Sequence, residues 1–443
     1  MLRHTLKYKL ITYLLGRACL AFVLWLSLLN KIHTRLTQQQ VNVLKNTSLL
    51  NNALSLLALF WCSVSFADNN DIEFSGFARA VGGYLDTSSA EYEGYDDSVS
   101  FSEKSLLGLQ ADYTLNQYFS ASAQVLLHSD ENRESGIEWL YITYAPNDAL
   151  QFNVGRLRTP SLKYSDVIDV GFAYPWVNAP QQLYSSYLFS QYEGGNARFR
   201  GRLGKVTYDI EGYLGRYNDD LRTSGLAIDV EIDTLYGGVL ELNYGGFQLR
   251  TAVTGARKVE AQIEGVAPLI NGLQAAGFED IAENFIINDS VSSFLVGASY
   301  DGLKWYASAE WMSVNSDIEL LAELESYYVS AGYYIDDVLL HATYASSSQS
   351  LNNIENTIPI GVSPDLDGLF FAVEELNSSF PTDNLDTITL GARWDFKTNM
   401  ALKAEVSFLD GEEGNTSFFE VKDGEEGFDR QATLYQVALE WVF

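Results

Sequence analysis

The sequence predicts an all-β fold, a transmembrane antiparallel β-barrel of sixteen strands with short turns at one end and long loops at the other. Three observations lead to this prediction: apolar and polar residues alternate along many segments, these segments are even in number, and short connections are interleaved with longer ones. In residues 68–443 no run approaches the roughly 20 apolar residues of a membrane helix. A chain that enters a membrane without such helices must close into a barrel, because only then are all backbone N–H and C=O groups paired.

The composition suits strands and turns and argues against nucleic acid as a partner. The 443 residues include 27 Tyr and 34 Gly, and aromatic residues make up 13% of the chain. Such a profile fits many strands and turns better than a helical domain. The chain carries 58 Asp+Glu against 28 Lys+Arg, so it lacks the basic surface that a polyanion requires.

Residues 1–67 form a targeting region that differs from the rest of the chain. They contain seven basic residues and no acidic one, which leaves 21 bases against 58 acids and a formal net charge of −37 in residues 68–443. Lys45 precedes the apolar run "LLNNALSLLALFWCSVSFA", in which Ser65 and Ala67 occupy the small-residue positions of a signal-peptidase site. We expect cleavage after Ala67, so that residues 68–443 form the outer-membrane barrel domain.

The segment upstream of this signal peptide has two interpretations. We expect translation to begin near Val43 or Leu44, which makes residues 1–42 an extension upstream of the true start. Alternatively, the apolar run at residues 18–29 serves as an anchor, although it is too short to span a bilayer comfortably.

Alternation of period two identifies the individual strands. In "KVTYDIEGYLG", Val206, Tyr208 and Ile210 share one face, while Thr207 and Asp209 share the other. The pattern recurs in "LKWYASAEWM", "FQLRTAVTG", "YYVSAGYYI" and "TITLGARWDF". The sixteen expected strands are residues 72–84, 105–115, 118–129, 136–145, 149–158, 194–203, 205–217, 234–244, 247–256, 291–300, 303–314, 325–335, 338–347, 385–396, 399–409 and 431–443.

The connections support this division into strands. Most of the short ones are rich in Asn, Asp and Gly, which supply the positive φ angles that hairpins need. The expected tight turns lie at Asn116-Gln117, Pro146-Asn147-Asp148, Gly204, Gly245-Gly246, Asp301-Gly302, Asp336-Asp337 and Lys397-Thr398. Proline cannot donate to a sheet ladder, and all eight prolines fall in the expected turns and loops. A soluble β-sandwich or propeller is the alternative, but the repeated blade signature of a propeller is missing.

The last strand, "ATLYQVALEWVF", shows which face is apolar. Alternation places Tyr435, Val437, Leu439, Trp441 and Phe443 on one face, and Gln436, Ala438 and Glu440 on the other. A strand that ends on Trp and Phe fits a barrel whose outer face touches lipid and whose aromatic girdle lies at the interface.

The terminal "ALEWVF" and the segment "VGRLRTPSLKYSD" resemble those of the general bacterial porins, and so does the strand layout over about residues 71–443. Members of this family are sixteen-stranded trimeric diffusion channels of the Gram-negative outer membrane. The resemblance implies short periplasmic turns, long external loops, and a homotrimer in which the loop at Asp130 to Ser135 latches onto a neighbour. It also implies contact with outer-membrane lipid and lipopolysaccharide, and a C-terminal strand that the barrel-assembly machinery reads.

The connection after the fifth strand, from about Thr159 to Glu193, is too long for a hairpin. Long ordered loops are usually functional. The resemblance implies that it folds into the lumen and narrows the pore, whereas the sequence alone also allows an outward lid. It contributes Lys163, Asp166 and Asp169 to the expected constriction, together with the aromatic residues between Tyr164 and Trp176.

Arginines are expected on the wall that faces this loop. In "NARFRGRLG", Arg198, Arg200 and Arg202 share one face, and it should be the luminal one, because an arginine facing lipid costs about 2–4 kcal/mol near the midplane. Arg79 is also expected in the lumen. Opposed to the loop aspartates, these cations would set a transverse field across the pore. The alternative is a row of structural salt bridges.

Arg156 and Arg158 follow a different argument. They share their parity with Leu150, Phe152 and Val154, so a bulge near Gly155 is needed to turn them inward. The resemblance favours that bulge, and we include both arginines in the expected constriction.

Enzymatic, metal and cofactor chemistry have little support in the sequence. Both cysteines, Cys19 and Cys62, lie in the leader, and His128 and His341 are the two histidines of residues 68–443. His128 precedes Ser129 and Asp130, but we interpret it as an ordinary rim or luminal residue rather than a catalytic one. We therefore expect no catalytic residue, no metal site and no cofactor.

Two loop segments stand out from the β pattern. Residues 260–283 place apolar residues near helical spacing, which predicts a short helix interrupted by Pro268. The motif "DGEEG" occurs at residues 410–414 and again at 423–427. Such acidic clusters bind divalent cations only if their oxygens converge, so a solvated loop is the simpler interpretation.

Together these features predict a passive, water-filled porin that admits small hydrophilic solutes and ions. The second hypothesis is a substrate-selective channel for anions or saccharides, in which the arginines and loop aromatics form a binding track. The third is a receptor or adhesin barrel that acts through its loops.

The leader analysis predicts a defined mature N-terminus. Sequencing the protein purified from outer membranes should read Asp68-Asn69-Asn70, because signal peptidase cuts after Ala67. A start well upstream of Asp68 would contradict this cleavage site.

Overall fold

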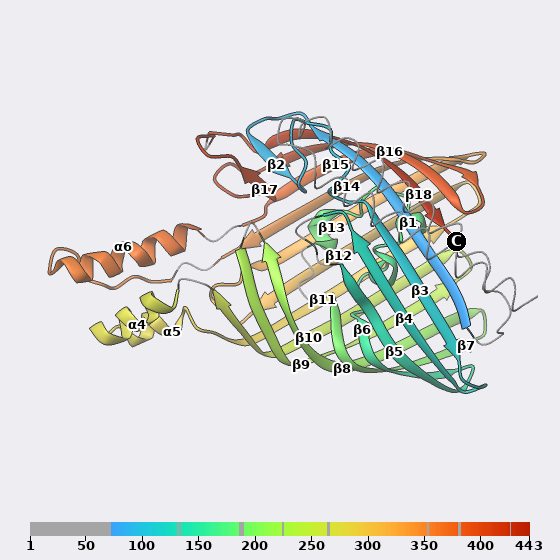
Figure 1. Cartoon of the computed structure of the whole chain (residues 1–443), viewed down its shortest axis with the longest axis horizontal. Helices are drawn as coiled ribbons and strands as arrows, with labels where there is room; N and C mark the ends of the chain where they lie inside the picture. The colour runs from blue at the N-terminus through green and yellow to red at the C-terminus, as the bar shows by residue number, and fades with distance from the viewer. Residues whose placement is uncertain are drawn as a thin grey trace, which may run out of the picture. The chain divides into compact units, whose positions relative to one another are not determined.

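The computed structural model describes residues 72–443 except 131, 132, 134, 186–189, 224, 225, 264, 265, 352, 353, 380, 381 and 426. The expected leader, residues 1–67, lies outside the described residues. Within the described part, sixteen antiparallel strands close into one barrel (Figure 1). The predicted sixteen-stranded antiparallel barrel is confirmed.

The barrel strands follow one another in sequence order around the wall, and the first pairs with the last. They are β1 (Ile72–Leu85), β3 (Leu106–Thr114), β4 (Phe119–His128), β5 (Gly136–Asn147), β6 (Leu150–Arg158), β7 (Gln191–Leu203), β8 (Val206–Thr223), β9 (Leu226–Tyr244), β10 (Phe247–Ile263), β11 (Ile287–Asp301), β12 (Trp305–Ser316), β13 (Glu323–Ile335), β14 (Val338–Ser350), β15 (Leu385–Lys397), β16 (Met400–Gly411) and β18 (Gln431–Val442).

Strands β8, β9 and β10 extend further at the long-loop end than the sequence pattern predicts. The inward residues Leu235 and Ile232 of β9, and Ala256 and Val259 of β10, are each separated by two residues instead of one. The alternation therefore changes phase there, although both strands continue to bury apolar residues. Because the prediction requires strict alternation, its strands stop at this point.

The tight turns have the expected chemistry. Gly204, Gly245 and Asp336 have φ angles of 63°, 60° and 51°. The expectation that every proline lies in a turn or loop is wrong for Pro146, which lies in the last residues of β5. The β5–β6 pairing shifts register between Tyr144 and Asn147, so no ladder bond requires an N–H from this proline.

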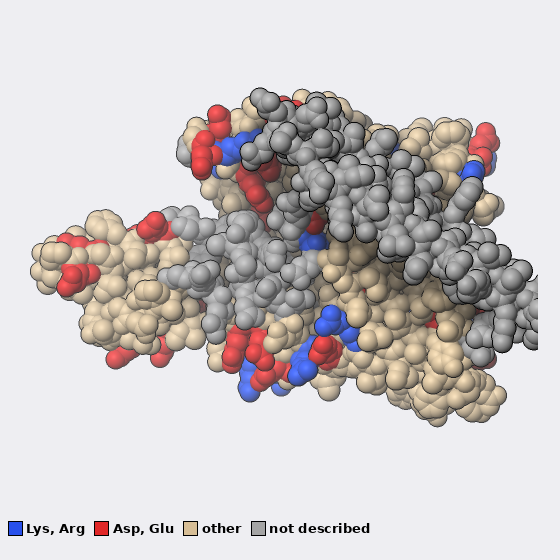
Figure 2. All heavy atoms as spheres, viewed as in Figure 1, with Lys and Arg blue, Asp and Glu red and all other residues tan. Residues whose placement is uncertain are grey.

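The outer face of the barrel is apolar. On β18, Tyr435 and Val437 are 46% and 49% exposed, whereas Gln436 and Glu440, which face inward, are 4% and 1% exposed. Aromatic pairs such as Tyr300 and Trp305, whose ring centroids are 4.3 Å apart, lie at the short-turn end. In Figure 2 the visible wall toward that end is largely free of charged atoms, as a lipid-facing surface requires.

Several elements lie in the long loops. A two-stranded sheet joins β2 (Ala90–Tyr92) in the first loop to β17 (Phe419–Val421) in the last. Helices α4 (Ala267–Ala276), α5 (Glu279–Glu283) and α6 (Pro364–Ser379) lie beyond the strands (Figure 1). The expectation that Pro268 interrupts the helix is wrong, because Pro268 lies in the first turn of α4, where proline is tolerated. None of the helices in the described residues is long and apolar enough to cross a membrane.

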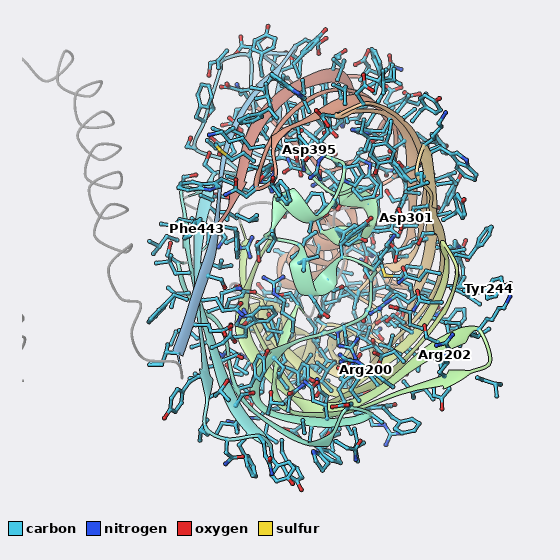
Figure 3. All side chains as sticks on the ribbon, turned by 90° about the vertical axis from the view of Figure 1, so that its right-hand side faces the viewer. Arg200, Arg202, Tyr244, Asp301, Asp395 and Phe443 are labelled. Atoms are coloured by element: carbon cyan, nitrogen blue, oxygen red, sulfur yellow. The ribbon has the colours of Figure 1, made fainter. Side chains whose placement is uncertain are left out.

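The loop between β6 and β7, residues 159–190, folds into the barrel, and we call it loop 3. It contains the short helices η3 (Ser165–Val167), η4 (Gly171–Ala173) and α3 (Gln181–Tyr184). Figure 3 shows it crossing the interior, viewed from the short-turn end. The inward fold expected for this loop is confirmed by its contacts with inward-facing side chains of the wall.

Candidate functional site

Three inward-facing cations, of which two are buried and one is partly buried, hold loop 3 against one wall of the barrel through its main chain. Arg79 of β1, Arg393 of β15 and Lys403 of β16 donate hydrogen bonds to main-chain carbonyls of the loop, and we call them the carbonyl clamp. Their acceptors are the carbonyls of Val177 for Arg79, Phe172 and Tyr174 for Arg393, and Gly171 and Trp176 for Lys403. Most of the acceptors are thus main-chain carbonyls, and Arg79 also donates to the Tyr174 hydroxyl at 3.2 Å.

Acids and aromatic rings balance the clamp charges. Glu440 of β18 lies 3.2 Å from Arg79 and 3.8 Å from Lys403. The Lys403 ammonium lies 4.8 Å from the centre of the Tyr174 ring. Burial raises the pKa of Tyr174 to about 12, so its hydroxyl stays protonated and donates to the carbonyl of Ile168. Arg79 is therefore luminal, as its parity indicates, but loop 3 covers it.

The loop aromatics form a packed cluster. Trp176 donates from Nε1 to Thr343 Oγ1 at 2.7 Å and packs edge-on against Tyr328, with ring centroids 5.3 Å apart. Tyr164 packs in the same way on Trp176, with centroids 5.7 Å apart. Trp176 and Tyr174 are 1% and 2% exposed, so these two rings fasten the loop and do not line a binding track.

A second anchor surrounds Asp169. Arg133 donates to Asp169 Oδ1 at 2.8 Å, and the buried Arg158 forms ion pairs with both Asp169 and Glu138. Burial by itself raises the pKa of Asp169, but the charges of Arg158 and Arg133 outweigh burial and hold this pKa below its usual range. Arg158 also donates to the carbonyl of Ser165 at 3.2 Å. This group fixes the start of loop 3.

Arg156 does not point into the barrel as Arg158 does. Gly155 has a φ of 146°, and the register places Arg156 opposite Leu140, whose side chain is 51% exposed on the outer face. Arg156 shares this face with Val154 and forms an ion pair with Glu193 at 3.2 Å. The irregularity at Gly155 therefore does not turn Arg156 into the lumen, and the inward Arg158 is held by loop 3 and Glu138.

Lys163 is fastened to the wall at β11 and β12. Its backbone N–H donates to Glu310 Oε1 at 2.8 Å, and its Nζ donates to Ser299 Oγ at 3.0 Å and lies 3.5 Å from Asp301 Oδ2. Arg250 of β10 holds the preceding turn by donating to the carbonyls of Pro160 and Ser161.

The opposite wall carries Arg198 and Arg200. Both donate from Nε to Asp209, Arg198 at 2.7 Å and 2.8 Å to its two oxygens and Arg200 at 2.9 Å. Arg202 donates to the carbonyl of Gly204 in the β7–β8 turn, at the end of the barrel (Figure 3). Two of the three expected wall cations thus share one carboxylate, and the third belongs to the turn.

Polar side chains continue this wall as a hydrogen-bonded ladder. Thr143 donates to Asn153 Oδ1 at 2.7 Å, Asn153 to Asn196 Oδ1 at 2.8 Å, and Asn196 to Glu211 Oε1 at 2.8 Å. Across from the ladder lies Asp166, which is exposed on η3 and has no ion pair among the described residues. Its charge acts on Arg198 and on Glu211.

The expected constriction left out the clamp residues Arg393 and Lys403, the anchor Arg250, and the wall acids Asp209 and Glu211, although Asp209 was placed on the polar face of its strand. Alternation in their strands could have identified all five as inward-facing. Among the described residues, no group of three or more His, Cys, Asp and Glu is arranged to hold a metal ion.

The carbonyl clamp generates a prediction about the loop. Replacing Arg79 and Lys403 together by Met should free the segment 171–177, because four of the buried hydrogen bonds to the loop are then lost. Limited proteolysis of the folded barrel, followed by mass spectrometry, should show new cleavage within residues 159–190. The matched control is Lys422→Met, which removes a half-exposed cation outside the barrel; equal cleavage in both variants would exclude the clamp.

Asp169 generates a prediction about pH. Its pKa is lowered in the folded protein, so its contribution to stability is present above the unfolded pKa of about 3.9 and is lost as the pH falls through the folded pKa. Asp169→Asn should cost about 3 kcal/mol at pH 7. Thermal unfolding in detergent should show that this difference from wild type shrinks below about pH 4. A difference that is equal at pH 7 and at acid pH would contradict the assignment.

Comparisons with known proteins agree with this architecture. A sequence model described as Gram-negative porin matches residues 53–440. A loop L8 deletion mutant of OmpT, an outer membrane protein of Vibrio cholerae, is 12% identical, with 84% of this chain and 99% of that chain covered and a TM-score of 0.51. OmpF of Salmonella typhi, in complex with daunomycin, is 13% identical, with 84% and 97% covered and a TM-score of 0.50. At these identities the two structures show a shared fold. A search of curated proteins gives no significant match. The chain therefore belongs to the Gram-negative porin family, lies in the outer membrane and forms a diffusion channel there.

Proposed function

We propose that small hydrophilic solutes and ions cross this channel by passive diffusion, between the Asp166 side of loop 3 and the wall of β6–β8. The observation that carries this proposal is that loop 3 is fastened to β1, β6 and β10–β16, whereas the inward polar side chains of β7 and β8 bond to one another. The carbonyl clamp and the Trp176 cluster fasten it to the wall of β13–β16 and β1. The facing wall presents the polar ladder and Arg198 instead, which suits a water-filled passage.

In this proposal the expected constriction residues divide into two groups. Asp166, Arg198 and Arg200 line the passage and set its field. A second set holds loop 3 in position, namely Arg79, Arg158, Lys163 and Asp169. Arg202 at the turn and Arg156 on the outer face lie outside the constriction.

A substrate-selective channel is the second candidate. Apolar side chains such as Leu235, Val239, Leu295 and Met312 point inward from β9–β12 and are buried with loop 3 in one cluster. This packing fills part of the lumen, and a narrower passage favours discrimination between solutes.

Further proposals concern assembly. We propose a homotrimer, contact with lipopolysaccharide, recognition of β18 by the barrel-assembly machinery, and a mature domain of residues 68–443. We also propose that the chain has no enzymatic activity, since its family and fold are those of a channel.

The constriction generates a prediction about ion selectivity. Replacing Arg198 and Arg200 by Ala should shift selectivity toward cations, because Asp209 loses both partners while Asp166 and Glu211 remain. Asp166→Asn should shift it toward anions. Reversal potentials in a salt gradient across planar bilayers measure both effects.

Arg202→Ala is the matched control, since it removes a cation from the same strand at the turn. A reversal potential that is unchanged in the Arg198/Arg200 variant, or equal to that of Arg202→Ala, would count against the proposed constriction. The same recordings separate the two candidates: a general porin conducts in proportion to salt, whereas a selective one is blocked by its solute.

A further inference from the structure

Three arginines form a row across the outer face of strands β6–β10. In the backbone register, Arg156 of β6 lies opposite Glu193 of β7, and Glu193 lies opposite Arg216 of β8. Arg257 of β10 lies two strands beyond Arg216, opposite Thr234 of β9. We call Arg156, Arg216 and Arg257 the outer basic row.

The row points away from the lumen. Two residues before Arg156 and Arg216, on the same faces, Val154 and Leu214 are 65% and 60% exposed. The neighbouring Leu157 and Tyr217 point inward and are buried. In Figure 2, basic and acidic atoms gather on the visible wall near the strands labelled β6 and β8 in Figure 1, beside an otherwise uncharged surface.

Four cations and two acids lie at the level of the row, because Lys258 and Asp233, next to Arg257 and Thr234 in the chain, form an ion pair at 2.9 Å. Glu193 lies 3.2 Å from Arg156 and 3.1 Å from Arg216, so a single carboxylate serves two guanidinium groups. The Arg216 side chain remains 70% exposed. Arg257 lies over the Tyr236 ring at 5.3 Å from its centre, which orients its guanidinium along the outer surface.

The row lies at the external edge of the apolar band. On β12, the outward Trp305 and Trp311 are six residues apart, one near each edge of that band. On β7, Glu193 is likewise six residues above the outward Phe199. The row thus occupies the level at which lipid headgroups begin, where the cost of an exposed arginine falls to about 0–1 kcal/mol.

The residues at this level differ between the two sides of the barrel. The whole sequence has 58 acids against 28 bases. On the far side of the barrel, the exposed outward positions just beyond Tyr327, Ile388 and Phe408 are acidic. They are Glu325, Asp386 and Asp410. The three arginines therefore distinguish β6–β10 from these strands, and acids follow further out on β9 and β10, at Glu231 and Glu260.

We propose that the outer basic row binds the phosphate of a phosphorylated lipid headgroup in the outer leaflet, with acyl chains of the same lipid lying against Val154 and Leu214. Guanidinium groups present N–H donors in a planar fork that matches a phosphate, and the apolar residues below suit hydrocarbon. This inference rests on the proposed contact with lipopolysaccharide and deepens it by naming the residues and the chemical group.

The experiment compares lipid A with its dephosphorylated form by native mass spectrometry of the folded barrel in detergent. The test variant replaces Arg156, Arg216 and Arg257 by Gln. The matched control replaces Lys205, Lys304 and Lys397 by Gln, which removes the same charge from exposed positions at the short-turn end. The single variant Arg216→Gln, at the most exposed ion-paired arginine of the row, serves if the triple variant does not fold.

Wild type and control should prefer phosphorylated lipid A, and the triple variant should bind it about tenfold more weakly, since charge-assisted hydrogen bonds are lost. Equal binding by the triple variant and wild type would show that the outer basic row does not bind the phosphate, while the proposed contact with lipopolysaccharide would still stand. No binding to wild type would overturn the lipid contact itself. Dissociation of oligomers in the triple variant, with lipid binding unchanged, would show that the row contacts a second copy and would also overturn the proposal.

Discussion

The barrel depends on closure of its hydrogen-bond ladder. In hydrocarbon no water can pair with a free strand edge, so the first and last strands must bond to each other. Here β1 and β18 pair from Phe77 with Val442 to Leu85 with Leu434. The backbone of Phe443 extends this seam, because its N–H and C=O both bond to Gly76, at 2.9 Å and 2.8 Å. Closure then fixes one face of every strand toward lipid and the other toward the interior, which explains an aromatic residue at the chain end.

A loop folded inside the closed wall also needs partners for its main-chain carbonyls, and charged side chains of the wall provide them. The main chain of a loop inside a barrel has no neighbouring strand to donate hydrogen bonds to its carbonyls, and a buried unpaired carbonyl is costly. Arg79, Arg393 and Lys403 supply the missing donors. Arg79 and Lys403 are buried and need an acid beside them, and Glu440 lies 3.2 Å from the first and 3.8 Å from the second. The position of the loop is thus set mainly by the wall.

The inside and outside of the wall carry separate charge patterns. Arg198 and Arg156 lie on adjacent strands, yet one bonds Asp209 inside the barrel and the other bonds Glu193 on its outer surface. Because strand side chains alternate between faces, each pattern can change without disturbing the other. Net charge therefore says little about either the passage or the lipid-facing surface.

The strand number, the tight turns, the apolar outer face and the inward parity of Arg79 and Arg198 could be predicted from the amino-acid sequence, because they follow from a local period of two. It could not determine where that period shifts, and so it missed the ends of β9 and β10, where two residues separate inward positions. Which cations face loop 3 and which face outward follows from contacts between distant parts of the chain. Arg156 and Arg158 share a parity, but Arg158 is drawn to Asp169 and Glu138 while Arg156 stays outside with Glu193. Arg79 faces inward yet is covered, because its partners belong to a loop about 100 residues away in the chain, and only folding brings them together.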